Sequence, residues 1–99
     1  MTIVETRNDN VITLKIEGRI DTNTSPVFQD YILKGFQKVN NLILDFEKCA
    51  YASSAGLRAL LIGQKTADSK KGTMKLINVP AVLMSVLEMT GFVNILNIE

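Results

Sequence analysis

The chain has 99 residues, of which 46% are hydrophobic and 21% are charged, and its formal net charge is +1 at pH 7. This length and composition predict one folded domain, residues 1–99, and so small a net charge gives no indication of nucleic acid or an anionic membrane as a partner. The chain has no histidine and one cysteine, Cys49, which excludes histidine-based nucleophilic catalysis, histidine or thiolate zinc sites and an internal disulfide.

The chain also lacks the marks of a membrane or exported protein. No apolar run approaches the ~20 residues that a membrane span requires. Met1 opens directly onto a strand-like segment without a targeting pattern. We therefore expect a cytoplasmic protein with neither a membrane nor nucleic acid as a direct partner.

The N-terminal segment predicts a β-hairpin. Residues 2–7 are rich in β-branched side chains, and residues 11–18 alternate polar and apolar side chains. The turn between them, Asn8-Asp9-Asn10, contains residue types that tolerate a left-handed backbone. The two strands are therefore expected to be antiparallel.

A helix, a strand and a loop follow the hairpin. Ser25 is expected to cap the first helix, which opens at Pro26 and ends near Asn40. Residues 42–46 (LILDF) form a continuous apolar run, which predicts a strand buried on both faces. Residues 47–54 (EKCAYASS) are expected to form the loop after it.

The remaining chain predicts two more helices and two more strands. The second helix is expected over residues 55–70, with Gly72 as its left-handed C-terminal residue. A strand (73–79), a helix (80–91) and a weak last strand (93–98) complete the order β-β-α-β-α-β-α-β. This order predicts an α/β fold whose mixed, mostly parallel sheet has four to five strands, an antiparallel N-terminal hairpin and about three helices.

Two loops are candidates for a functional site, because such sites collect beyond the carboxyl ends of parallel strands. In the first, residues 18–25, Asp21 is either the carboxylate of an Asx turn or a contact for a partner. In the second, residues 47–56, Ser53 and Ser54 open a helix. One of them is expected to cap it, but a bare helix start also suits a phosphate. Gly56 predicts either a close approach to a neighbour or a required turn.

The same residues offer little catalytic chemistry. Ser54 as a nucleophile would need Lys48 or Lys65 as its base, and nothing in the sequence brings either lysine near. Asp21 and Asp45 do not have the spacing of a metal motif. Asp45 is instead expected at its strand's end, accepting N–H groups of the loop. We therefore predict no catalytic residue, no metal and no cofactor.

Three segments together resemble the STAS domain family. GRIDTNTS resembles the family's G-E-L-D-x-x-T segment. LILDFEKCAYASSAGLRALL resembles its signature, in which a hydrophobic strand ends in Asp or Asn and hydrophobic-x-[DS]-S-[SATG]-G-L opens a helix. PAVLMSVLEMTGFVNILNIE resembles the closing helix, its L-x-x-[ST]-G turn and the last strand. The segments occur in the family's order and spacing and cover essentially the whole chain, as one STAS domain.

Single-domain bacterial members of this family are anti-sigma-factor antagonists, so the resemblance implies a binding switch and not an enzyme. The unmodified antagonist binds an anti-sigma factor, a serine protein kinase of the histidine-kinase-like ATPase class, and thereby frees a sigma factor. Phosphorylation of one serine breaks the complex, and a serine phosphatase restores it.

The register of Gly56-Leu57 identifies the family's phosphorylated serine with Ser54. Ser53 stands where the family usually has Asp, which makes it a second candidate. Ala52 and Ala55 also depart from the usual pattern. The implied partner-binding surface consists of Asp21, Thr22, Thr24, Ala52, Ser53, Ser54, Ala55, Gly56 and Leu57.

Two other functions stay open at this point. A STAS scaffold module that is never phosphorylated, in a stress-signalling or lipid-transport assembly, is favoured by the missing Asp before Ser54. A small hydrolase using Ser54 is disfavoured by the absence of histidine. No phosphate-binding glycine loop is present, so we do not predict nucleotide binding.

Overall fold

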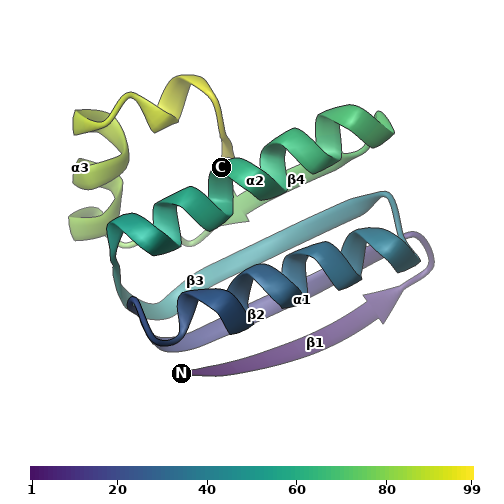
Figure 1. Cartoon of the computed structure of the whole chain (residues 1–99), viewed down its shortest axis with the longest axis horizontal. Coiled ribbons are helices and arrows are strands. Elements are labelled where there is room, and N and C mark those ends of the chain that lie inside the picture. Colours follow the sequence, from purple (N-terminus) through teal and green to yellow (C-terminus); the bar gives the residue numbers. More distant parts are fainter.

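The computed structural model describes residues 1–99, which form one five-stranded sheet with the strand order β1-β2-β3-β4-β5 (Figure 1). β1 is antiparallel to β2, and every other neighbouring pair is parallel. The predicted α/β class, the opening hairpin and the order of the elements are thus confirmed. The elements are β1 (Thr2–Asn8), β2 (Val11–Ile20), α1 (Ser25–Lys38), β3 (Asn41–Ala52), α2 (Ser54–Lys70), β4 (Thr73–Ile77), α3 (Ala81–Met89), the 3₁₀ helix η1 (Phe92–Asn94) and β5 (Asn97–Ile98).

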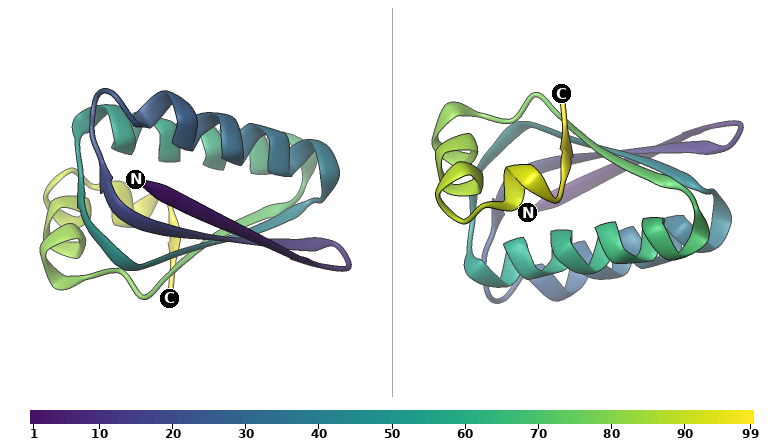
Figure 2. Two further views of the ribbon diagram at one scale, coloured as in Figure 1. Left: turned by 90° about the horizontal axis from the view of Figure 1, so that it is seen from below. Right: turned by 90° about the horizontal axis from the view of Figure 1, so that it is seen from above.

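The sheet is covered by α1 and α2 on one face only (Figure 2). Along β3, Leu42, Leu44 and Phe46 are buried beneath these helices, whereas Ile43 and Asp45 on the other face are half-buried. The prediction that this strand is buried on both faces is therefore wrong. Because β2, β3 and β4 are added in one direction, right-handed crossovers place both helices on the same side.

α3 and η1 lie beside the end of the sheet where α2 begins (Figure 2). Leu83 and Leu87 of α3 are buried and extend the core at this end. The last strand is shorter than predicted. Only Asn97–Ile98 pairs with β4, since η1 takes up part of the segment expected to be extended.

β3 is much longer than the sequence predicts. It continues to Ala52 and pairs with β2 as far as Ile20, so most of the expected loop at residues 47–54 is a strand. The register shifts twice, between Lys15 and Glu17 and between Gly18 and Arg19 of β2. Such irregularities break the alternation of buried and exposed side chains, which is why the segment does not read locally as a strand.

α1 begins and α2 ends close to the predicted positions, but the residues that cap these ends differ from the prediction by one position. Thr24, and not Ser25, is the N-cap position of α1, and Ser25 is buried as the first helical residue. At the end of α2 the left-handed residue is Lys71, with φ 59°, and not Gly72. Gly72 is required for a different reason, because a Cβ there would overlap the carbonyl oxygen of Asn40.

None of the helices combines the length and the apolar character that crossing a bilayer would require.

Candidate functional site

The start of α2 is bonded to the end of β2. The backbone N–H of Ser53 donates to the carbonyl oxygen of Ile20 over 2.8 Å. A Cβ on Gly56 would lie 2.8 Å from Cγ2 of Ile20, closer than side chains approach. The prediction that Gly56 permits a close approach is thus confirmed, and the two candidate loops meet at this junction.

The two serines at the start of α2 have different environments. Ser53 is the N-cap: its backbone is extended, and its Oγ accepts the backbone N–H of Gly56 at 3.3 Å. Ser54 is the first helical residue, and its side chain is exposed. No hydrogen bond within the chain involves the Ser54 hydroxyl. The helix is therefore capped by one serine and presents the other to solvent.

Asp21 organises the loop between β2 and α1. Its Oδ1 accepts the backbone N–H groups of Asn23 and Thr24, each at 2.9 Å, so the predicted Asx turn is confirmed. The Thr24 hydroxyl accepts the N–H of Asp21 at 2.8 Å and lies 3.0 Å from the carbonyl oxygen of Arg19. The pKa of the Asp21 carboxyl is lowered, chiefly by the N–H of Thr24, with help from the Thr24 hydroxyl, Asn23 and Arg19. Oδ2 makes no bond within the chain.

The nine residues of the predicted partner surface are not equally accessible. Ala52, Gly56 and Leu57 are buried and hold the junction together. Thr22 and Ser54 are exposed. The remaining members are half-buried: Asp21, Thr24, Ser53 and Ala55.

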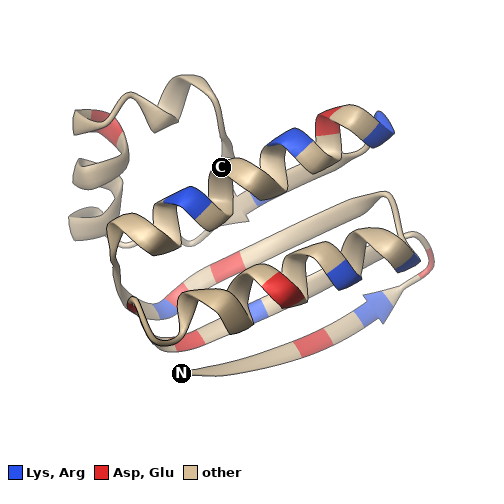
Figure 3. Ribbon diagram, in the orientation of Figure 1, with Lys and Arg blue, Asp and Glu red and all other residues tan.

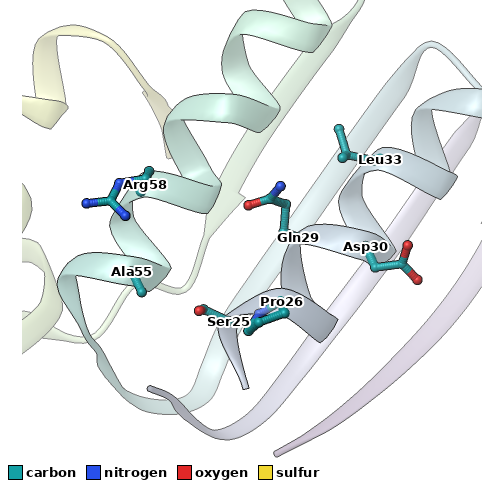
Figure 4. Close-up of a pocket in the computed structure, with 7 residues that line it drawn as sticks. All are labelled: Ser25, Pro26, Gln29, Asp30, Leu33, Ala55 and Arg58. Carbon is teal, nitrogen blue, oxygen red and sulfur yellow. The ribbon is translucent and has the colours of Figure 1, made fainter. Parts of the chain in front are cut away.

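A groove of about 290 Å³ lies between α1 and the first turns of α2, and Ala55, the residue after Ser54, is part of its lining (Figure 4). Ser25 and Gln29 point from α1 toward α2, whereas the Arg58 guanidinium points from α2 away from α1 (Figure 4). The groove is lined by Ser25, Pro26, Gln29, Asp30, Leu33, Ala55 and Arg58.

Arg58 is a candidate functional residue that the sequence analysis missed. It lies four residues after Ser54, so both side chains emerge on the same side of α2. Its side chain is exposed, and it belongs to none of the three ion pairs of the chain, which are Lys34–Asp30, Lys38–Glu5 and Lys75–Glu99. The signal was present in the sequence as the four-residue spacing from Ser54.

Other groups considered for chemistry lie elsewhere or are already bonded. The prediction that Asp45 lies at its strand's end is wrong, because β3 continues beyond it to Ala52. Its Oδ1 does accept a backbone N–H, that of Glu47 at 3.0 Å, and it also accepts a hydrogen bond from Nδ2 of Asn78 at 3.1 Å. Burial raises the pKa of the Cys49 thiol, which disfavours the reactive thiolate. No three His, Cys, Asp or Glu side chains cluster as a metal site would require.

This fold and site define an α/β protein whose sheet is covered by helices on one face and whose second helix begins with an exposed serine. The sequence profile of the STAS domain family matches residues 2–99, and the chain belongs to that family. The resemblance stated from the sequence is thereby confirmed.

Individual relatives agree with this assignment. The chain is 26% identical over 93 residues to the anti-sigma-B factor antagonist of Bacillus subtilis (strain 168), covering 94% of this chain and 85% of that protein. Two solved structures of the Bacillus protein SpoIIAA, each 17% identical, share the fold. The unphosphorylated anti-sigma factor antagonist superposes with a TM-score of 0.84, covering 99% of this chain and 88% of that chain. The phosphorylated form superposes with a TM-score of 0.78, covering 99% of this chain and 91% of that chain.

Proposed function

We propose that this protein is an anti-sigma-factor antagonist, acting as a single STAS domain and switched by phosphorylation of Ser54. The observation that carries the proposal is the separation of the two serines: Ser53 is bonded as the helix cap, and the Ser54 hydroxyl is exposed and unbonded. Similarity to the Bacillus subtilis anti-sigma-B factor antagonist supports the function. That SpoIIAA has a phosphorylated form supports the modification.

The partner in this proposal is an anti-sigma factor, a serine protein kinase of the histidine-kinase-like ATPase class, with a serine phosphatase reversing the modification in the cytoplasm. The accessible part of the site consists of Thr22 and Ser54, flanked by the half-buried Asp21, Thr24 and Ala55. No hydrogen bond joins the Ser54 hydroxyl to a base, and the chain has no histidine, so this hydroxyl is suited to receive a phosphoryl group from another protein's active site and not to catalysis.

The location of Ser54 explains how a phosphate acts as a switch without unfolding the domain. A phosphoserine adds about −1.5 to −2 charges at pH 7, which the positive end of the α2 dipole and its free N–H groups tolerate. At an interface matched to a neutral hydroxyl the same charge is repelled and costly to desolvate. A difference of ~2.7 kcal/mol weakens binding about a hundredfold.

The site of modification is tested by incubating the protein with its cognate anti-sigma kinase and ATP and mapping the product by mass spectrometry. We expect one phosphate on Ser54, retained in Ser53→Ala and absent from Ser54→Ala. Phosphate on Ser53 would show that Ser53, and not Ser54, is the modified residue. A chain that no candidate kinase modifies contradicts the switch itself.

The effect of the charge is tested with Ser54→Asp in a binding assay with the anti-sigma factor. We expect a folded variant, by circular dichroism, whose affinity for the partner is reduced at least about tenfold. Ser69→Asp places the same charge on the exposed far end of α2 and serves as the control. Equal affinity of Ser54→Asp and wild type would disprove the electrostatic mechanism.

A second candidate function is a STAS scaffold module that is never phosphorylated, in a stress-signalling or lipid-transport assembly. Its support is Ser53, which stands where the family usually has Asp. The gene neighbourhood separates the two candidates, because an adjacent kinase and sigma factor favour the switch, and transporter or stress-assembly subunits favour the scaffold.

A further inference from the structure

The outer edge of β1 is unpaired. β1 is the first strand in the order of the sheet, and β2 is the only strand that pairs with it (Figure 1). Its register with β2 is continuous from Thr2 to Asn8, with no bulge and no proline. An edge of this kind presents a row of free backbone N–H and C=O groups to any strand that can pair with it.

Two opposite charges lie on this strand, on the same face. Glu5 pairs with Leu14 and Arg7 pairs with Ile12 across the hairpin, so both charged side chains lie on the face covered by the helices. Figure 3 shows the acidic and basic bands in succession along β1. Oε2 of Glu5 binds Nζ of Lys38 at 3.1 Å, whereas Oε1 makes no bond within the chain.

The sheet's geometry allows only a few ways for β1 to pair with a second β1. With a two-fold axis perpendicular to the sheet, residues that oppose each other must have their side chains on the same face of the sheet. One residue of β1 must therefore lie opposite its own copy, with the axis between the two. An axis at Glu5 would oppose two carboxylates. An axis at Val4 would oppose Ile3 and Glu5. An axis at Thr6 opposes Glu5 of each copy to Arg7 of the other.

We propose that this protein forms a dimer in which β1 pairs antiparallel with β1 of a second copy about Thr6. Opposite charges directly across an antiparallel pair are stabilising, and like charges are destabilising, so the two Glu5–Arg7 pairs select this register. The two sheets become one continuous sheet. Because the strands run in opposite directions, the Ser54 sites lie at opposite ends of the dimer, and the pairing does not depend on the function proposed for them.

The first test measures self-association by sedimentation equilibrium over a concentration series. We expect wild-type protein to dimerise, Arg7→Glu and Glu5→Arg each to weaken the dimer at least about tenfold, and the double exchange Glu5→Arg/Arg7→Glu to restore it. Lys65→Glu on α2 and Glu88→Arg on α3 make matched charge changes at exposed residues of other elements. Thermal melts followed by circular dichroism establish that each variant is folded.

The second test adds one exposed thiol to the chain, whose native cysteine, Cys49, is buried. With the axis at Thr6, the two Thr6 Cα atoms lie about 4.5–5.5 Å apart, which a disulfide can bridge. Thr6→Cys is therefore expected to cross-link into dimers under mild oxidation, and Val4→Cys is not, because Val4 opposes Asn8 of the other copy.

Three results would overturn the proposal. One is a wild-type protein that remains monomeric at millimolar concentration. Another is faster cross-linking by Val4→Cys than by Thr6→Cys. The third is a dimer that survives Arg7→Glu but is lost in Val82→Asp, since Val82 is 72% exposed on α3 and would then mark the interface.

Discussion

The carbonyl oxygen of Ile20 accepts the backbone N–H of Ser53 over 2.8 Å, so the last residue of β2 is bonded directly to the cap of α2. This bond brings the Asp21 turn beside the first turn of α2. Ser54 then extends outward, while the residues on the inner side of that turn, Gly56 and Leu57, are buried. The candidate site is therefore a junction between two connections, and the residues bonded across it, Ile20 and Ser53, are more than 30 positions apart in the chain.

The close contact at this junction predicts a steric effect of substitution. Gly56→Val would force a side chain against Cγ2 of Ile20, which already lies 2.8 Å from the position of a Cβ. Overpacking of this kind costs typically about 1–3 kcal/mol in the free energy of unfolding. Urea denaturation measures it, with Ser69→Ala on the exposed side of α2 as the control. Unchanged stability of Gly56→Val would show that the junction can open.

The separate environments of the two serines predict opposite consequences for stability and modification. Ser53→Ala removes the cap bond to the N–H of Gly56 and should cost about 1 kcal/mol of unfolding free energy. Ser54→Ala removes no bond and should change stability by less than about 0.5 kcal/mol, while abolishing phosphorylation. Chemical denaturation and the kinase assay together check this pair. Equal losses of stability would contradict the assignment of Ser53 as the cap.

The Asp21 turn predicts a pH dependence. Because the bonds from Thr24 and Asn23 lower the pKa of the Asp21 carboxyl in the folded protein, its ionised form stabilises the fold. That stabilisation is fully present above the unfolded pKa of ~3.9 and is lost as the pH falls through the lower folded pKa. The melting temperature of wild type should therefore exceed that of Asp21→Asn near pH 7, and the difference should shrink below about pH 4.

Asp30→Asn is the control for this experiment. Asp30 lies on the exposed side of α1, where its carboxylate pairs with Lys34. A difference between Asp21→Asn and wild type that stayed constant across the pH range would mean that the charge of Asp21 does not stabilise the turn.

The spacing of Ser54 and Arg58 predicts an ion pair in the phosphorylated protein. A phosphate on Ser54 would lie one helical turn before an unpaired guanidinium, in the favourable orientation for an acid and a base four residues apart. The second pKa of phosphoserine is ~6 in the absence of such a partner. We expect Arg58 to lower it and Arg58→Gln to raise it again.

This prediction is checked by a ³¹P NMR titration of protein carrying phosphoserine at position 54, introduced during synthesis so that no kinase is needed. Lys65→Gln removes a positive charge further along the same helix and should leave the titration unchanged. Identical midpoints for wild type and Arg58→Gln would show that the guanidinium does not reach the phosphate.

The sequence by itself determined the features that depend on local pattern. The Asn8-Asp9-Asn10 turn, the polar and apolar periodicities and the small residues before Gly56 were sufficient to predict the order of the elements and a helix beginning at the two serines. Each of these features involves neighbouring residues only. The resemblance of three segments then identified the family and singled out Ser54.

Only the tertiary structure decided how far the strands pair, which face of the sheet the helices cover and which serine caps α2. The extension of β3 to Ala52 depends on pairing with β2 across two register shifts, and the regular alternation of buried and exposed residues ends where these shifts occur. The open face of the sheet follows from the handedness of two crossovers. The roles of Ser53 and Ser54 differ because the bond to Ile20 fixes the cap, and that contact joins residues far apart in the chain.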